Sequence, residues 1–183
     1  MRLAILSDIH DNVWNLAFAL AHVRDCDAMI CCGDLCSPFV IDELANGFPH
    51  DIHIVFGNND ADLFRITNKT RVHTNVHLHG EFFEAELDGL RIAANHFDFL
   101  AKPIAQAGLH DVVCFGHNHV FEIARLGRTL AINPGSIMGA QFTPYGRVDV
   151  APTFVVFDTA SRQAAGFQID ANHRITEYRA AAG

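Results

Sequence analysis

The sequence predicts an α/β fold in which two mixed sheets pack together and helices cover the outside. Two observations support this prediction. In the first third of the chain, short apolar runs alternate with helical segments, the pattern of parallel strands joined by helical crossovers. In the second half, pairs of apolar runs flank tight turns, the pattern of antiparallel hairpins. Two packed sheets with helices outside are the simplest architecture that holds both kinds of pairing.

The first third is predicted to run strand, helix, strand, helix, strand. The first helix covers residues 12–23, because apolar side chains recur at i, i+3, i+4 and i+7 from Val13. The second helix starts with Ser37 as the N-cap and Pro38 as the first helical residue, and it ends near Gly47. The strands are the apolar runs at residues 3–6, 28–32 and 52–56.

The second half is predicted to contain hairpins, one helix and one further buried strand. Asp88-Gly89 is a strong hairpin signal, and Gly127 marks a second tight turn. Pro103 is expected to open a helix that ends at Gly108, and a buried strand at residues 111–115 follows it. The expected hairpins pair residues 82–87 with 90–95, 119–125 with 129–133, and 153–158 with 163–169.

Length and composition indicate one globular domain over residues 1–183. Half of the residues are apolar and 19% are charged, which excludes an extended disordered chain. The net charge of −8 and the scattered Lys and Arg residues argue against extended nucleic-acid binding. No apolar stretch approaches a membrane span, and residues 3–6 are too short for a signal-peptide core. An odd count of five cysteines without an export signal predicts reduced thiols and a cytoplasmic protein.

Polar residues follow five predicted strands at the point where each strand ends. Each motif alone is ordinary turn chemistry, but the ordered set of five is far more specific. Because ligand sites in α/β sheets lie beyond the carboxyl ends of the strands, the five clusters are expected to form one site. They are Asp8-Ile9-His10, Gly33-Asp34, Gly57-Asn58-Asn59-Asp60, Asn95-His96 and Gly116-His117-Asn118-His119.

The residue types in these clusters predict a metal centre. Carboxylate and amide oxygens combined with imidazole nitrogens, and no thiolate, suit Mn, Fe, Zn or Ni. Seven strong ligands are too many for one ion with an open position, but they suffice for two ions that share a carboxylate. Paired ions are a recurrent device for the cleavage of phosphate esters. The predicted ligands are Asp8, His10, Asp34, Asn58, His96, His117 and His119.

The ordered motifs resemble the calcineurin-like metallophosphoesterases, whose pattern is D-x-H, G-D, G-N-x-D/E, a histidine and G-H-x-H. Asn133-Pro134-Gly135-Ser136 also resembles a turn of the short YfcE-type branch of this family. The resemblance implies a four-layer α/β/β/α sandwich and a metal-dependent phosphoester hydrolase. It implies a small phosphodiester substrate, two divalent ions with Mn favoured and Ni, Fe or Zn as alternatives, and a homodimer.

The resemblance also implies roles for individual residues. Asp34 would bridge the ions, and a metal-bridging hydroxide would attack phosphorus in line. Asn12 would lie beside the phosphate or order the outer shell. The first metal would be held by Asp8, His10, Asp34 and His119, and the second by Asp34, Asn58, His96 and His117.

Two departures from the family pattern carry expectations of their own. Asn59 stands where many members have a histidine that is thought to protonate the leaving group. Asparagine supplies no proton at neutral pH, so phosphodiesters with good leaving groups are the expected substrates. Phe97 stands where relatives often have glycine, and it either narrows the mouth of the site or packs. Residues 137–151 are either a specificity loop or a plain connection.

Other classes of function are alternatives to a phosphoesterase. The main one is a non-catalytic protein-binding scaffold on the same fold, like a retromer subunit. An amidohydrolase barrel needs a longer chain, and the motifs of nucleotide-binding loops and of Ser–His–Asp hydrolases do not occur here. His77 and His79 are expected to share one face of a strand as ordinary surface histidines. Cys31 and Cys32 are expected to pack in a buried strand rather than bind zinc.

Overall fold

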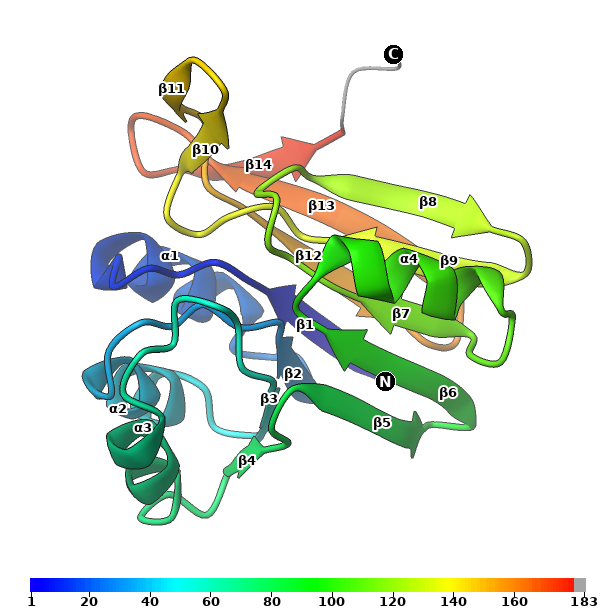
Figure 1. Ribbon diagram of the computed structural model, residues 1–183, viewed down its shortest axis with the longest axis horizontal. Helices are drawn as coiled ribbons and strands as arrows, with labels where there is room; N and C mark the ends of the chain where they lie inside the picture. Colours follow the sequence, from blue (N-terminus) through cyan, green and yellow to red (C-terminus); the bar gives the residue numbers. More distant parts are fainter. Residues whose placement is uncertain (180–183) are drawn as a thin grey trace.

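In this computed structural model, which describes residues 1–179, two β-sheets pack face to face and helices cover their outer faces (Figure 1). The predicted four-layer α/β/β/α sandwich is therefore confirmed. The larger sheet contains, in spatial order, β14 (Ile175–Tyr178), β13 (Gln163–Ile169), β12 (Thr153–Asp158), β1 (Arg2–Leu6), β2 (Ala28–Cys31), β3 (Asp51–Ile54) and β4 (Val76–Leu78). The smaller sheet contains β5 (Phe82–Leu87), β6 (Leu90–Asn95), β7 (Val112–Cys114), β9 (Thr129–Asn133) and β8 (Glu122–Leu126).

The helices divide unequally between the two outer faces. The larger sheet is covered by α1 (Val13–Val23), α2 (Phe39–Gly47) and α3 (Leu63–Thr70), and the smaller sheet by α4 (Asp98–Gln106) (Figure 1). A separate hairpin of β10 (Ala140–Thr143) and β11 (Gly146–Asp149) lies beyond both sheets. Within residues 1–179, no helix is both long enough and apolar enough to cross a lipid bilayer.

Strand β1 shows why a continuous apolar run marks the centre of this fold. Ala4 and Leu6 pack with the helices, whereas Leu3 and Ile5 pack in the core between the two sheets. All four side chains have no exposed surface, so both faces of the strand are buried. Parallel pairing of β1 through β4 confirms the predicted crossovers, and antiparallel β12 pairs with the other edge of β1.

The hairpin predictions are confirmed. Strands β5 and β6 pair in register around Asp88 and Gly89, whose φ angles are 50° and 74°. Positive φ at both central residues is the requirement of a type I′ turn, which Asp-Gly meets. The pairings of β8 with β9 and of β12 with β13 are also as expected.

Two helix starts were predicted wrongly. The helix on the smaller sheet begins at Asp98, so Pro103 lies inside it rather than at its start. The Phe97 carbonyl accepts the N–H groups of Leu100 and Ala101, and Asp98 places a negative charge in the first turn, so a local start signal outweighed the proline. Ser37 does not cap α2, because its hydroxyl donates to the Asp11 carboxylate.

The elements that were not predicted lack a strong pattern of their own. Helix α3 has eight residues, and strands β10, β11 and β14 have four each, so each element holds few apolar positions. Strands β2 and β3 end one and two residues earlier than predicted, respectively.

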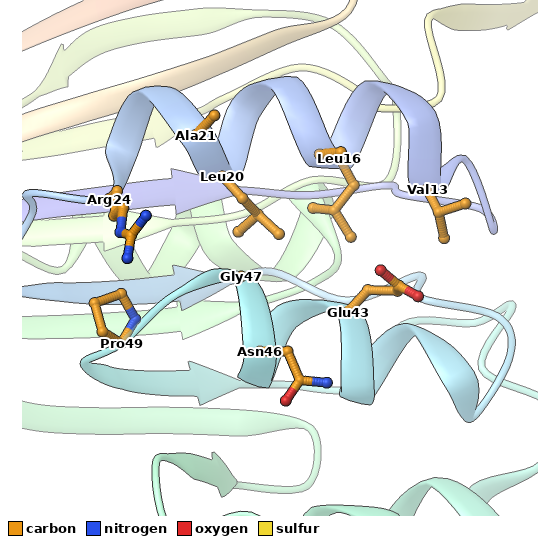
Figure 2. A pocket seen from close by; sticks show the side chains of 10 residues that line it. Val13, Leu16, Leu20, Ala21, Arg24, Glu43, Asn46, Gly47 and Pro49 are labelled. Atoms are coloured by element: carbon orange, nitrogen blue, oxygen red, sulfur yellow. The ribbon is translucent and has the colours of Figure 1, made fainter.

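A groove of about 410 Å³ runs between α1 and α2 on the outer face of the helix layer (Figure 2). Gly47 allows this close approach, because a Cβ there would lie 2.5 Å from the Leu20 Cδ1 atom. None of the seven predicted ligands lines the groove, so the site predicted from the sequence lies elsewhere.

Candidate metal centre

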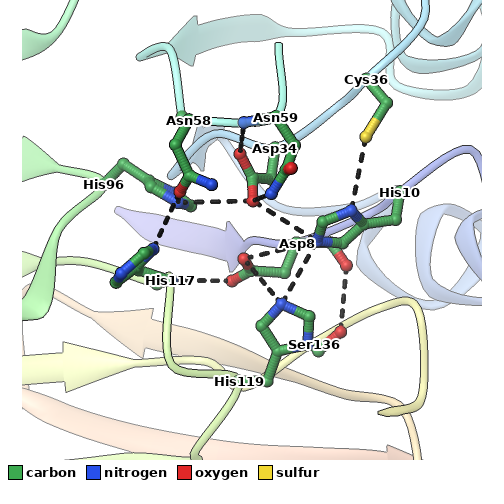
Figure 3. A network of polar contacts seen from close by, with 12 residues as sticks. Asp8, His10, Asp34, Cys36, Asn58, Asn59, His96, His117, His119 and Ser136 are labelled. Atoms are coloured by element: carbon green, nitrogen blue, oxygen red, sulfur yellow. Dashed lines mark hydrogen bonds and ion pairs between the residues drawn. The ribbon is translucent and has the colours of Figure 1, made fainter. Parts of the chain in front are cut away.

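All seven predicted ligands meet where the carboxyl ends of strands from both sheets converge (Figure 3). Strands β1, β2 and β3 of the larger sheet end just before the ligands at positions 8, 10, 34 and 58. Strands β6 and β7 of the smaller sheet end just before those at positions 96, 117 and 119. The site therefore depends on the packing of the two sheets against each other.

The first group of side chains has the density of a metal site. Asp8, His10, Asp34 and His119 each offer one ligand atom, and these atoms all lie within 4.8 Å of one another. The His10 Nε2 atom is 3.4 Å from Asp34 Oδ2, and His119 Nε2 is 3.3 Å from Asp8 Oδ1.

The second group surrounds the Asn58 amide. The Asn58 Oδ1 atom lies 2.9 Å from His117 Nδ1 and 3.1 Å from His96 Nε2. The His96 Nε2 atom is also 3.5 Å from Asp34 Oδ2. One carboxylate oxygen of Asp34 is therefore within 3.5 Å of an imidazole nitrogen from each group (Figure 3).

Backbone carbonyls orient two of the imidazoles. The Nδ1 atoms of His96 and His119 lie 2.7 Å from the Cys32 carbonyl and 2.6 Å from the Ala140 carbonyl, respectively. Since a carbonyl only accepts, both Nδ1 atoms carry the proton and both Nε2 atoms face the site. The Nδ1 atom of His10 faces the Cys36 thiol at 3.3 Å, a contact that the sequence analysis missed.

Asp60 joins two ligand loops through hydrogen bonds to their backbone. Its carboxylate accepts the backbone N–H groups of Asp34 (3.0 Å), Cys36 (2.9 Å) and Gly57 (2.7 Å). Burial raises the pKa of Asp60, while these three donors favour the charged form. Asp60 thus supports the loops that carry Asp34 and Asn58 without facing the site itself.

The ligand loops adopt backbone conformations that L-residues rarely occupy. Asp8, His10, Asp34, His117 and His119 have φ angles of 54°, 44°, 57°, 74° and 58°. Each such conformation costs free energy, and such residues concentrate at functional sites. These backbone conformations therefore lower the stability of the fold while they direct the side chains into the site.

The glycines of the motifs allow the loops to approach closely. A Cβ on Gly116 would overlap the Ser7 hydroxyl, and one on Gly57 would overlap the Asp34 carboxylate. A Cβ on Gly33 would lie 2.7 Å from the Gly57 backbone nitrogen. No side chain fits at these three positions, because a neighbouring ligand loop already fills the space.

Electrostatics make this pocket attractive to cations. Burial alone raises the pKa of Asp8, but the nearby imidazoles of His10 and His119 outweigh it and hold the pKa well below its usual range. Burial likewise raises the pKa of Asp34, but the contact with His96 lowers it overall. Burial lowers the pKa of His96 and of His119, yet the two carboxylates raise both pKa values overall.

One buried atom tests whether these residues fit a metal ion. Asp8 Oδ1 is inaccessible to solvent and has no well-formed hydrogen bond within residues 1–179, although His119 Nε2 lies 3.3 Å away. An unpaired buried carboxylate oxygen is costly. Surrounded by imidazole Nε2 atoms, it has the donor environment of a divalent cation, so the residues fit the group.

The two other residues predicted at the site make hydrogen bonds of their own. Asn59 donates its backbone N–H to Asp34 Oδ1 and its side-chain amide to Asp34 Oδ2, both at 2.8 Å. Asn12 caps α1 by accepting the Asn15 N–H, and its Nδ2 donates to the Met138 carbonyl at 3.1 Å.

The Asn-Pro-Gly-Ser turn lies directly behind the ligand loops. The Asn133 Nδ2 atom donates to the Gly116 carbonyl at 3.1 Å, and the Ser136 hydroxyl donates to the Asp8 carbonyl at 3.0 Å. The sequence shows the turn motif but not these contacts, of which the one between Ser136 and Asp8 joins segments more than a hundred residues apart.

A two-sheet α/β sandwich with Asp, Asn and His ligands at its strand ends defines a metal-dependent hydrolase of the calcineurin type. A family model of the calcineurin-like phosphoesterase superfamily domain matches residues 1–162, and the chain belongs to this superfamily. The family inferred from the motifs is therefore confirmed. A curated relative, phosphodiesterase MJ0936 from Methanocaldococcus jannaschii, is 29% identical over 167 residues, which cover 89% of this chain and 96% of the relative.

Solved structures agree with this assignment. An archaeal phosphodiesterase superposes with a TM-score of 0.79 and 26% identity, covering 92% of this chain and 99% of that one. Vacuolar protein sorting 29 from Cryptosporidium parvum has a TM-score of 0.71 at 17% identity, with 97% of both chains covered. The second likeness is a likeness of fold alone.

Proposed function

We propose that this protein is a dinuclear-metal-dependent phosphoesterase that acts on phosphodiesters. The observation that carries the proposal is the position of Asp34 Oδ2, within 3.5 Å of His10 Nε2 on one side and His96 Nε2 on the other. In this proposal Asp34 is the bridging ligand. One ion is held with Asp8, His10 and His119, and the other with Asn58, His96 and His117.

Two such ions, when bound, supply an activated water for in-line attack on phosphorus and neutralise charge on the phosphate oxygens. Asn59 lies against the Asp34 carboxylate, to which its Nδ2 group donates one hydrogen bond, and the second hydrogen of that group would be donated to a phosphate oxygen. Asn12 orders the outer shell, because Met138, whose carbonyl it holds, donates its own N–H to the Asp8 carbonyl.

The charge around the site favours a diester over a monoester. Among the described residues, no Lys or Arg forms a hydrogen bond or ion pair with a proposed ligand. Lys102 pairs with Glu122 at 2.7 Å, and Arg65 pairs with Asp62 at 3.1 Å. A phosphodiester carries one negative charge at phosphorus and a monoester carries up to two. The diester therefore needs less support from cationic side chains than the monoester does.

Metal identity, compartment and assembly are part of the same proposal. The family resemblance favours Mn²⁺, and the mixed oxygen and nitrogen donors also accept Ni²⁺, Fe²⁺ and Zn²⁺. A cytoplasmic location agrees with five unpaired cysteines, of which Cys31, Cys32 and Cys114 are fully buried. A homodimer follows from the family resemblance, and sedimentation tests it directly.

The central experiment compares metal-stripped protein with and without added Mn²⁺ on an aryl phosphodiester and on the matching monoester. Asp34→Asn is the test variant, and Asp62→Asn, at an exposed aspartate outside the site, is the control. We expect metal-dependent diester cleavage that is lost in Asp34→Asn and retained in Asp62→Asn. Bound metal without cleavage by Mn²⁺, Ni²⁺ or Zn²⁺ protein would overturn the proposal and favour the non-catalytic scaffold.

A separate variant tests the role of Asn59. Asn59→His introduces a group that can protonate a leaving group, so alkyl phosphomonoesters should be cleaved at least about tenfold faster, within the range of general acid catalysis. Rates across leaving groups of graded pKa measure this, and the dependence on leaving-group pKa should become shallower. An unchanged dependence would show that Asn59 does not determine leaving-group preference.

A further inference from the structure

Three phenylalanine rings lie around the outer histidines of the metal centre. The Phe97 and Phe99 rings lie 5.1 and 6.0 Å from the His117 ring, between centroids, and both meet it nearly edge to face. The Phe142 ring lies 5.5 Å from the His119 ring in the same arrangement. Aromatic rings therefore stand beside both histidines of the His-x-His motif.

Two of these rings are exposed to solvent rather than used in the core. Phe99 and Phe142 have 60% and 61% of their surface exposed, whereas Phe97 is half-buried and packs against His96 and His117. Of the two roles expected for Phe97, packing is the one that these contacts show. Exposing a phenylalanine ring forfeits the stabilisation that its burial would give. Other aromatic side chains, such as Trp14 and Phe64, are also exposed, but Phe99 and Phe142 each lie beside a proposed ligand.

The backbone ties each exposed ring to a metal ligand. Phe99 follows His96 by three residues, in the first turn of α4. Phe142 lies on β10, whose Ala140 carbonyl accepts the His119 Nδ1–H, and the Gln141 side chain donates to the His119 carbonyl at 3.0 Å. The β10–β11 hairpin, which falls within residues 137–151, is thereby anchored at the site. The backbone around both rings is thus tied to segments that carry proposed ligands.

We propose that Phe99 and Phe142 are specificity residues that bind a flat aromatic ring on an ester group of the substrate. The inference rests on the proposed phosphoesterase function and names its substrate class, an aryl or nucleoside phosphodiester. An ester group of a phosphate bound at the ligands would reach these exposed rings. Stacking of a base or an aryl ring on such a face strengthens binding by about tenfold or more.

Calorimetry on the metal-loaded protein tests this without turnover. Phenylphosphonate is compared with methylphosphonate, and thymidine 5′-monophosphate with 2-deoxyribose 5-phosphate, so the two pairs distinguish an aryl ring from a nucleobase. We expect the aromatic member of at least one pair to bind about tenfold more tightly. Phe99→Leu and Phe142→Leu should reduce that preference several-fold and leave the binding of methylphosphonate within twofold.

Phe64→Leu is the matched control, since Phe64 is 77% exposed on α3 and touches no proposed ligand. Equal binding of both members of each pair by the unchanged protein would overturn the inference. So would equal losses for both members in the variants, or unchanged preference together with a shift from dimer to monomer, which would make the rim a subunit interface. Diester hydrolysis without aromatic preference defeats this inference alone, whereas aromatic preference without hydrolysis defeats the proposed function alone.

Discussion

In two histidine-rich regions of this molecule, the pKa values of the histidines are shifted in opposite directions. In the metal centre, the carboxylates of Asp8 and Asp34 raise the pKa of His119 and of His96 despite burial. The second region, here called the edge cluster, consists of Asp51, His53, His77, His79 and Phe83, where β3 and β4 lie near β5 at one edge of the sandwich.

In the edge cluster, His53 Nδ1 and His79 Nε2 lie 3.0 Å apart, and Asp51 contacts His77 alone. Burial lowers the pKa of His53 to about 4, and burial also lowers the pKa of His79. Imidazoles are therefore abundant in both regions, but buried carboxylates occur only in the first. The carboxylates, rather than the number of histidines, therefore decide where a cation is stabilised.

The largest expected effect comes from removing a carboxylate charge in each region. Asp8→Asn should weaken Mn²⁺ binding by at least about 100-fold, or roughly 2.7 kcal/mol, because a buried anion facing two imidazoles is lost. Asp51→Asn should change binding by less than about twofold, within the usual scatter for exposed sites. Titration of metal-stripped protein measures both affinities. Comparable losses in the two variants would remove the distinction drawn between the regions.

The next effect concerns the support beneath the metal centre. Asp60→Ala leaves three backbone N–H groups without their shared acceptor, so the free energy of unfolding should fall by about 2–4 kcal/mol. Asp62→Ala, which removes the cap of α3 and an exposed ion pair with Arg65, should cost about 1 kcal/mol. Urea denaturation of the metal-free proteins measures both. A smaller loss for Asp60→Ala than for Asp62→Ala would mean that the ligand loops are held by other contacts.

The smallest effect is the opposite pH dependence of the two regions in metal-free protein. His96 and His119 have raised pKa values, so their stabilisation is present below the ordinary pKa of 6.5 and is lost as the pH rises through the raised values. His53 and His79 have lowered pKa values, so stability falls as the pH drops below 6.5. The melting temperature of the metal-free protein should therefore decline both as the pH rises above 6.5 and as it falls below 6.5, by shifts on the order of 2–4 °C.

Variants assign each side of this profile to one region. His119→Gln should flatten the decline above pH 6.5, and His53→Gln should flatten the decline below it, as measured by calorimetry from pH 5 to 8.5. Saturating metal should also remove the alkaline decline, because metal binding requires neutral imidazoles. If His53→Gln flattened the alkaline side instead, the two regions would have been assigned the wrong signs.

The sequence predicted much of the framework, because its signals are local. Asp88-Gly89 specifies its hairpin through backbone preference alone, and the apolar run before Asp8 specifies a strand buried on both faces. The start of α4 was predicted wrongly because proline is a weak signal when a carbonyl and an acidic residue upstream already begin a helix. Helix α3 and strand β14 were missed because they span only eight and four residues, too few for a repeat of apolar positions to be recognised in the sequence.

The sequence by itself determined the family, because Asp, Asn and His follow strand ends in a specific order. Tertiary structure alone decided that Asp34 lies between two groups of imidazoles and that Asp60 ties their loops together. It also decided that position 116 must be glycine, because the Ser7 hydroxyl fills the space that a side chain would need. The same packing brings the Phe142 ring beside the His119 ring. These relations join residues far apart in the chain, and the packing of two sheets, which no local pattern encodes, sets their distances.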